Sequence, residues 1–202
     1  SGTTTDAAPV IAAAFTTTNE ATYTSFDPRV VLSYKVSPSA NVYASYSTGF
    51  KSGGFQYVPF SKVDADVLFR PEQITAYEVG FKTDWLDRAL RINGSAYYYD
   101  IKDLQVSRII GLVSPTVLIF NAPKTTVKGI DIEITARPSR TFEVNIAYGY
   151  LDAKYDSYPF NATTDFSGTR AVRSPEHSVN FGAEWRPELG EAVHLTLRAD
   201  YA

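Results

Sequence analysis

The 202-residue sequence contains no cysteine and no methionine. The absence of cysteine excludes a disulfide framework, catalysis by a thiol and cysteine-based zinc sites. The first residues, 1–5, have neither the basic nor the apolar region of a secretory signal peptide. We therefore expect either that a signal peptide has been removed or that the chain is an internal fragment.

Long apolar runs and clusters of basic residues are also missing. No stretch approaches the roughly 18 consecutive apolar residues that a membrane helix needs, so a helical membrane protein is excluded. The formal net charge is −3, and the Lys and Arg residues are spread along the chain. Nucleic-acid binding requires a basic face, and the sequence therefore argues against DNA and RNA as partners.

Aromatic and β-branched residues are abundant, with 14 Tyr and 12 Phe among many Val and Thr residues. Such side chains fit the pleated surface of a sheet, which predicts an all-β chain. Alternation is clearest in residues 130–137, where apolar Ile130, Ile132 and Ile134 alternate with polar Asp131 and Glu133. The same period predicts about eight strands, over 28–36, 41–50, 73–85, 90–109, 118–137, 141–156, 176–186 and 192–201.

The connections between these strands alternate strictly between short and long. Short turns are predicted at 37–40, 86–89, 138–140 and 187–191, and long links at 51–72, 110–117 and 156–175. An antiparallel up-and-down meander would place all the short turns at one end and all the long loops at the other. This asymmetry is typical of outer-membrane barrels, which have short periplasmic turns and long external loops.

Aromatic residues next to the short turns support a transmembrane β-barrel. Trp85, Phe142 and Trp185 all belong to the apolar face, at the level of a periplasmic aromatic girdle. The alternation further predicts a contiguous, outward apolar band made of Ile130, Ile132, Ile134, Phe142, Val144, Ile146, Leu195 and Leu197. A soluble barrel with the two faces inverted stays open, because the period is the same in both arrangements.

Several segments resemble the barrels of TonB-dependent outer-membrane receptors. The similarity lies in residues 43–55, 70–72, 77–82, 97–106, 121–122 with 127–133, and 173–177, which occur in the order found in that family. Barrels of this type have about 22 strands and are filled by an N-terminal plug. The resemblance therefore implies an irregular or external loop segment over 1–27 and a partial barrel over 28–202, a fragment from the C-terminal half without a recognisable plug.

The resemblance also implies a function, namely import of a scarce nutrient such as an iron–siderophore complex across the outer membrane. The expected partners are outer-membrane lipid, the ferric siderophore, and the TonB complex through the plug that this chain lacks. Aromatic and cationic side chains in the long loops suit an anionic, aromatic ligand. The predicted ligand-binding residues are Phe50, Lys51, Phe55, Gln56, Tyr57, Phe69, Arg70, Arg108 and Tyr158.

Other functions find less support in the sequence. An enzyme needs convergent catalytic groups, but the two histidines, His177 and His194, are expected at opposite ends of the barrel wall. We therefore expect no catalytic residues, no metal site and no cofactor. The alternatives kept open are a passive outer-membrane porin or adhesin barrel and a soluble β-barrel that binds a small ligand.

Overall fold

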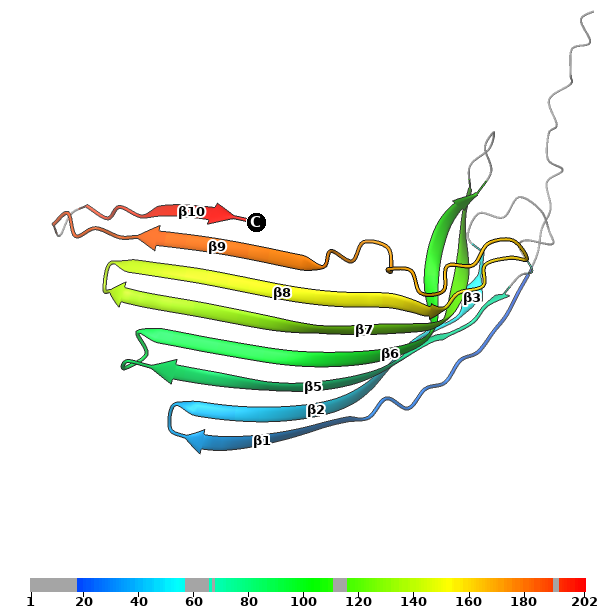
Figure 1. Ribbon diagram of the computed structural model, residues 1–202, viewed down its shortest axis with the longest axis horizontal. Helices are drawn as coiled ribbons and strands as arrows, with labels where there is room; N and C mark the ends of the chain where they lie inside the picture. Colours follow the sequence, from blue (N-terminus) through cyan, green and yellow to red (C-terminus); the bar gives the residue numbers. More distant parts are fainter. Residues whose placement is uncertain (1–17, 57–65, 67, 111–115, 191–192) are drawn as a thin grey trace, which may run out of the picture.

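The computed structural model describes residues 18–56, 66, 68–110, 116–190 and 193–202. Nearly all of this part of the chain is β-strand, and the strands form one eight-stranded sheet and one two-stranded sheet. The main sheet is a single curved layer (Figure 1). No helix in the described ranges is long and apolar enough to cross a membrane.

The eight strands of the main sheet pair in the order of the chain, each antiparallel to its neighbour. The all-β, up-and-down meander is thus confirmed. The strands are β1 (Arg29–Ser37), β2 (Ala40–Lys51), β5 (Glu72–Trp85), β6 (Leu90–Ile110), β7 (Thr116–Ser139), β8 (Phe142–Ser157), β9 (His177–Trp185) and β10 (Leu197–Tyr201).

Two details differ from the sequence prediction. The last strand begins at Leu197 rather than at residue 192, and His194 forms only an isolated bridge to Glu188. The expected loop between β2 and β5 contains a small sheet of its own, made of β3 (Gly54–Phe55) and β4 (Leu68–Phe69). Alternation in the sequence predicts which face a residue occupies, but strand pairing requires a neighbouring strand within hydrogen-bonding distance.

The short turns all lie at one end of the sheet and the long connections at the other (Figure 1). The turn between β5 and β6 is unusual because Leu86, Asp87 and Arg88 all have left-handed backbone conformations, with φ of 51°, 53° and 69°. Asp tolerates this region better than most residues. Because the turn is so tight, β5 and β6 pair from Trp85 and Leu90 onward without a shift of register.

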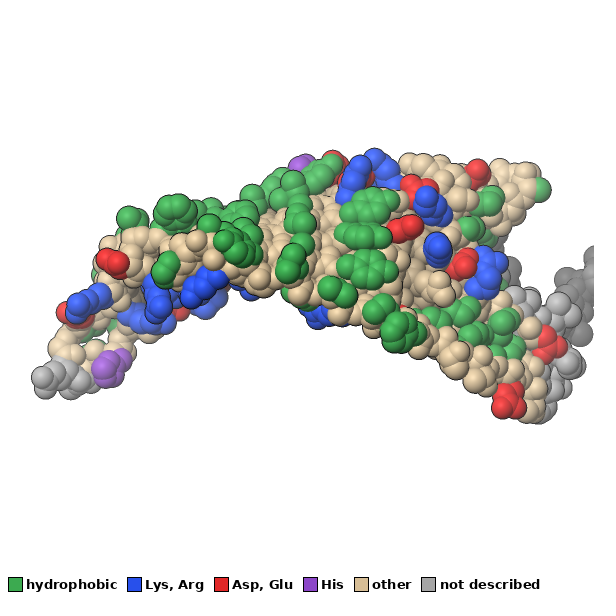
Figure 2. Space-filling model, turned by 90° about the horizontal axis from the view of Figure 1, so that it is seen from below, with side chains coloured by type: hydrophobic (Ala, Val, Ile, Leu, Met, Phe, Trp, Pro, Cys, Tyr) green, Lys and Arg blue, Asp and Glu red, His purple; other side chains and the backbone are tan. Residues whose placement is uncertain are grey.

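One face of the sheet is an apolar band that runs across the strands. Cross-strand partners extend it from Val42 through Phe81 to Gly94, and onward to Ile132. Ile130 and Ile132 remain 45 % and 37 % exposed, and Leu195 and Leu197 are exposed as well. Figure 2 shows hydrophobic side chains gathered over the curved wall. The predicted outward band is therefore present, in disagreement with a soluble barrel that would bury it in a dry core.

Aromatic side chains border this band at two levels. At the short-turn end, Phe142 pairs directly with Trp185. At the other level Tyr46, Tyr77 and Tyr98 are cross-strand neighbours, with ring centroids 5.4 and 6.5 Å apart in sequence order. We call these three residues the upper tyrosine row.

The spacing of the two aromatic levels matches a membrane. Tyr77 and Trp85 are eight residues apart on β5, which is about 26 Å along a strand and roughly 20 Å across a bilayer after strand tilt. The apolar band of outer-membrane barrels is about 25 Å tall. The two aromatic levels therefore bound a surface of the right height to face lipid.

The opposite face is polar, as the alternation predicted. The Tyr43 hydroxyl donates a 2.5 Å hydrogen bond to Glu78 on the neighbouring strand. Asn93 pairs with Glu133, and Ser95 pairs with Asp131. A hydrated or plugged lumen accommodates such groups. Burying them in a dry core without hydrogen bonds would cost roughly several kcal/mol of free energy for each charge.

Placing a charge on the apolar band tests which face meets lipid. In the intact receptor, Ile132→Lys puts an ammonium group midway between the two aromatic levels, and we expect the free energy of unfolding to fall by about 2–4 kcal/mol. Denaturant unfolding in lipid vesicles measures the change. Glu133→Lys, which places the same charge on the polar face one residue away, is the control and should change stability far less. Equal losses in both variants would contradict the assignment of the faces.

The outer edges of β1 and β10 have no partner strand among the described residues. An unpaired backbone group in lipid costs several kcal/mol, roughly, so an open sheet of eight strands should not insert as a stable unit. We expect residues 1–202 alone to show no compact, heat-modifiable species in gel electrophoresis, while the intact receptor shows one. A compact, heat-modifiable band from the 202-residue chain would instead indicate a closed eight-stranded barrel.

Candidate functional site: the external loops

The β6–β7 hairpin is the framework of the long-loop end. Pairing of β5 with β6 ends at Lys102, and pairing of β7 with β8 ends at Lys124. Beyond this level β6 and β7 continue together, from Leu104 paired with Ala122 to Ile110 paired with Thr116. Asp103 has a left-handed conformation with φ of 55° at the start of the extension. There the hairpin bends away from the wall (Figure 1).

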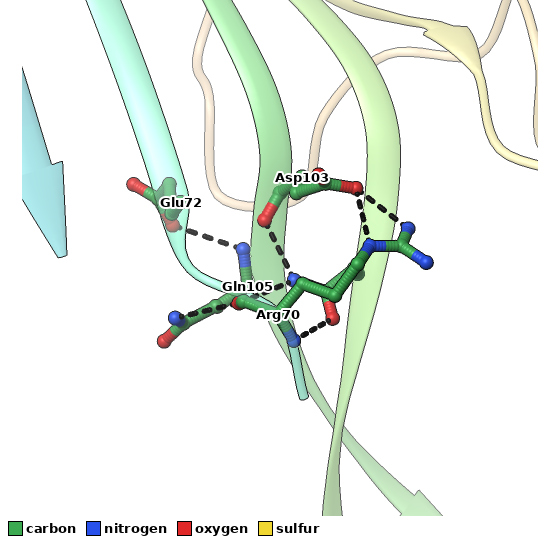
Figure 3. A network of polar contacts seen from close by, with 5 residues as sticks. Arg70, Glu72, Asp103 and Gln105 are labelled. Carbon is green, nitrogen blue, oxygen red and sulfur yellow. Dashed lines mark hydrogen bonds and ion pairs between the residues drawn. The ribbon is translucent and has the colours of Figure 1, made fainter. Parts of the chain in front are cut away.

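The chain before β5 lies on one face of this hairpin through a polar network (Figure 3). The side-chain amide of Asn121 accepts a 2.8 Å hydrogen bond from the Arg70 backbone amide and donates to the Arg70 and Asp103 carbonyls at 2.9 and 2.8 Å. The Arg70 guanidinium group binds the Asp103 carboxylate at 2.6 Å. Asn121 therefore pairs with Arg70 as a peptide group would.

Gln105, the cross-strand partner of Asn121, completes the network. Its backbone amide donates to the Glu72 carboxylate at 2.9 Å, and its side chain donates to the carbonyls of Ser52 and Arg70 at 2.9 and 3.2 Å. These bonds connect both ends of the β2–β5 connection to the hairpin. They fix where the β2–β5 connection leaves and rejoins the wall.

A second side-chain amide covers the free edge of β7. Gln56 donates to the Ile119 carbonyl and accepts from the Ile119 amide, both at 2.8 Å. β8 has already ended at this level, so the Ile119 backbone would otherwise have no protein partner on that side. Gln56 thus takes the place of a neighbouring strand.

The β3–β4 sheet packs through Phe69, which is 5 % exposed. The Phe69 ring lies over Gly54, where an added Cβ would come within 2.9 Å of it. Glycine is therefore required at position 54 for this close approach. Phe55 pairs with Leu68 in the same small sheet and is half-buried.

The β8–β9 connection covers the other face of the hairpin. Val106 and Ala122 of the hairpin form a buried cluster with Tyr155 and Tyr158 from the end of β8 and the following chain. Phe160, Phe166, Ala171 and Leu104 pack around this cluster. The two long connections therefore hold the hairpin from opposite faces.

Arg108 lies at the centre of the contact between the hairpin and the β8–β9 connection. Its guanidinium carbon lies 3.7 Å from the ring centroid of Phe160 and 4.9 Å from that of Phe166. Cation–π contacts of this kind contribute about 0.5–2 kcal/mol depending on desolvation. The guanidinium Nη1 atom is buried beside the Tyr158 hydroxyl, and neither atom has a hydrogen bond of ordinary geometry.

The surroundings shift the pKa values of two side chains in the β8–β9 connection. Burial raises the pKa of Tyr158, partly opposed by the charge of Arg108. Hydrogen bonds from the side chain and backbone of Ser167 lower the pKa of Asp165. Asp165 therefore stays ionised and keeps its turn to Ser167 down to more acidic pH than an ordinary aspartate would.

The predicted ligand-binding residues fall into different environments. Gln56, Phe69 and Tyr158 are buried, and Arg108 lies between two rings. Phe50 and Phe55 are half-buried, while Lys51 and Arg70 are exposed. Tyr57 lies outside the described residues.

Gln56 and Arg70 contact the hairpin together with Phe55 and Phe69 of the β3–β4 sheet, and Arg108 and Tyr158 lie on its other side. Lys51 pairs with Glu72 on the polar face of the wall, whereas Phe50 pairs with Gln73 and shares the apolar face with Tyr46 and Tyr77. Sequence reasoning missed Glu72, Asp103, Gln105 and Asn121. The only signal from Asp103, Gln105 and Asn121 was a polar residue within a predicted strand, and Glu72 was the last residue of the predicted long link 51–72.

The whole chain, residues 1–202, matches the family model described as "TonB dependent receptor-like, beta-barrel". The chain belongs to the TonB-dependent receptor β-barrel family. Members of this family are transport receptors of the Gram-negative outer membrane. The family assignment therefore agrees with the one-ended loops, the apolar band and the aromatic levels.

Curated TonB-dependent receptors are similar in sequence. "Probable TonB-dependent receptor BfrD" of Bordetella pertussis is 29 % identical over 168 residues, which are 81 % of this chain and 22 % of BfrD. "Ferrichrome outer membrane transporter/phage receptor" of Escherichia coli is 26 % identical over 77 % of this chain and 19 % of its own length. The chain thus spans about a fifth of the curated relatives it matches.

Solved structures show the same fold. The ferric yersiniabactin uptake receptor FyuA of Yersinia pestis has a TM-score of 0.66 at 19 % identity and matches 85 % of this chain with 24 % of its own. BauA, the ferric preacinetobactin receptor of Acinetobacter baumannii, has a TM-score of 0.60 at 23 % identity, over 86 % of this chain and 25 % of its own. In both, the matched part is about a quarter of a TonB-dependent receptor.

Asn121→Ala should loosen the β2–β5 connection without disturbing the wall. The variant loses two hydrogen bonds that hold residue 70 to the hairpin and one to the Asp103 carbonyl, and the two to residue 70 contribute about 2 kcal/mol in net terms. Amide hydrogen exchange around residues 68–72 of the intact receptor should accelerate roughly 30-fold. Asn93→Ala, on the luminal face of β6, is the control and should leave exchange in this segment unchanged. Unchanged exchange in Asn121→Ala would mean that other contacts hold the connection.

Proposed function

We propose that this chain supplies part of the wall and external loops of a TonB-dependent importer whose substrate is an iron–siderophore complex. The observation that carries the proposal is the polar side of the hairpin. The exposed cations Lys51 and Arg70 lie at the two ends of the β2–β5 connection, which also carries the aromatic Phe55; Phe50 precedes Lys51 on β2 and occupies the opposite face. In such a receptor the loops capture the ligand, and a plug driven by the TonB complex opens the path.

The chemistry of this surface suits a metal chelate. Lys51 offers an exposed ammonium group, and Arg70 is held by Asp103 with its side chain 59 % exposed. Exposed cations beside aromatic rings favour a ligand that is both anionic and aromatic. Gln56, Phe69, Arg108 and Tyr158 support this surface by holding the loops in place. They act as positioning residues in this proposal.

The names of similar proteins point to the same class of substrate. Relatives and structural neighbours include a ferrichrome transporter, receptors for ferric yersiniabactin and ferric preacinetobactin, and the "Metal-pseudopaline receptor CntO" of Pseudomonas aeruginosa, 25 % identical over 80 % of this chain and 21 % of CntO. These ligands are metal ions held by organic chelators. The copper transporter OprC shares the fold, with a TM-score of 0.62, which makes copper the alternative cargo to test.

A passive porin or adhesin barrel is the alternative function. It predicts uptake or adhesion that does not depend on the TonB complex. An importer predicts that uptake stops when the gene for TonB is deleted, while binding to the cell surface persists. Uptake of radiolabelled iron by cells with and without TonB separates the two.

Replacing Phe50, Lys51 and Arg70 together with Ala should weaken ligand capture in the intact receptor. We expect binding of the preferred member of a panel of ferric hydroxamate, catecholate and mixed siderophores to fall at least tenfold, because the variant removes both cations and one ring. Loops carry binding while the wall carries stability, so heat-modifiable migration should stay unchanged. Equilibrium binding to outer-membrane preparations measures the affinity.

Arg88→Ala, on a short turn at the opposite end of the sheet, is the matched control and should bind like the unmodified receptor. Unchanged affinity in the triple variant would remove these three residues from the site. Binding of copper but of no ferric siderophore would replace the iron–siderophore assignment by copper.

A further inference from the structure

The guanidinium group of Arg70 belongs to the proposed ligand surface and is also bound by a carboxylate of the chain itself. Its Nε and Nη2 atoms donate to one oxygen of Asp103, at 3.0 and 2.6 Å (Figure 3). The side chains of Arg70 and Asp103 are 59 % and 30 % exposed. Asp103 therefore occupies one edge of the guanidinium group in a position that is open to solvent.

Backbone contacts, rather than this ion pair, hold the β2–β5 connection to the hairpin. The side-chain amide of Asn121 binds the backbone amide and carbonyl of Arg70, at 2.8 and 2.9 Å. The Gln105 side chain binds the carbonyls of Ser52 and Arg70, at 2.9 and 3.2 Å. An exposed ion pair adds little to the stability that such bonds provide. The Arg70 side chain can therefore exchange partners while its backbone stays in place.

The backbone of residue 103 does not require a negative charge. Asp103 has φ of 55°, in the left-handed region, which Asn tolerates as well as Asp does. The carbonyl of Asp103, and not its carboxylate, accepts the 2.8 Å hydrogen bond from Asn121. The bend of the hairpin thus accounts for the backbone conformation at this position but not for the charge.

The second exposed cation of the ligand surface has a different relation to its neighbouring carboxylate. Lys51 pairs across the strands with Glu72. The Glu72 carboxylate accepts a 2.9 Å hydrogen bond from the Gln105 backbone amide, which directs it toward the hairpin. Asp103, in contrast, binds the guanidinium group of Arg70 itself. An anionic ligand that approaches Arg70 therefore meets the Asp103 carboxylate as a direct competitor.

We propose that Asp103 is a specificity-determining residue. It competes with the anionic groups of a ligand for Arg70 and thereby sets the affinity of the loops for anionic chelates relative to neutral ones. An anionic ligand has to displace Asp103 or share the guanidinium group with it, whereas a neutral ligand does not. A repulsive element beside an attractive one is a general source of binding specificity. The inference rests on the proposed function, which assigns Arg70 to the ligand surface.

Chemical labelling of Arg70 in the purified intact receptor measures this competition without a siderophore. Phenylglyoxal modifies guanidinium groups, and citrate, a trianion at neutral pH, is the probe that protects Arg70 by binding to it. In Asp103→Asn, the citrate concentration that halves the labelling rate should fall about fivefold, because the competition of an exposed ion pair is lost. Mass spectrometry of the peptide that contains Arg70 gives the rate.

The matched control is Asp84→Asn, which removes the carboxylate of the Arg91–Asp84 pair near the short turns. This variant should need the same citrate concentration as the unmodified receptor. Amide hydrogen exchange around residues 68–72 should be unchanged in Asp103→Asn, because backbone contacts hold the connection. The proposal would be overturned by an unchanged or higher citrate concentration in Asp103→Asn, by an equal fall in Asp84→Asn, or by faster exchange around residues 68–72.

Binding of ferric chelates tests the consequence for ligands. In Asp103→Asn, the affinity for an anionic ferric triscatecholate should rise about fivefold, while that for a neutral ferric trihydroxamate should not change. The rise should vanish when Arg70 is also replaced by Ala, because the two residues act as a pair. An equal rise for both chelates, or a rise that persists without Arg70, would contradict the proposal. A receptor that binds neither chelate would overturn the iron–siderophore assignment, whereas the citrate measurement would still decide whether Asp103 competes for Arg70.

Discussion

Every backbone amide and carbonyl that crosses a hydrocarbon layer must find its hydrogen-bond partner within the protein, and the architecture of this chain follows from that requirement. From β1 to β10 each strand supplies the partners of the next. Because pleated strands direct alternate side chains to opposite faces, the sheet acquires one apolar and one polar side without any further device. Ile132 and Glu133 are neighbours in sequence and lie on opposite sides of the wall.

The same requirement reappears where the wall ends. Above Lys124, β7 loses β8 as a neighbour, and a side chain replaces the missing strand. Gln56 pairs with Ile119 through both amide atoms, and Asn121 pairs with Arg70 in the same way. The long loops therefore continue the hydrogen bonding of the sheet. For this reason several residues that were expected to bind ligand make structural contacts instead.

The distribution of charged residues changes along the strands, from the short turns to the long loops. Ion pairs such as Arg91 with Asp84 and Arg137 with Glu143 lie near the short turns on the polar face. The apolar band lies between the aromatic levels, and lysines appear on its face from the level of Tyr98, which pairs with Lys128. Exposed ion pairs contribute about 0–1 kcal/mol each, so these charges determine position more than stability.

The strands of the main sheet, their faces and the one-ended order of turns could be predicted from the sequence, because a period of two and the chemistry of turn residues are local properties. Its resemblance to TonB-dependent receptors agrees with the family match over residues 1–202. The roles of Arg108, Gln56 and Asn121 follow from the folded structure and not from any local pattern. Arg70 lies 51 residues from Asn121 in the sequence, and Ile119 lies 63 residues from Gln56. The two rings around Arg108 are at least 52 residues away from it. No local pattern predicts a contact that depends on two loops meeting across one hairpin.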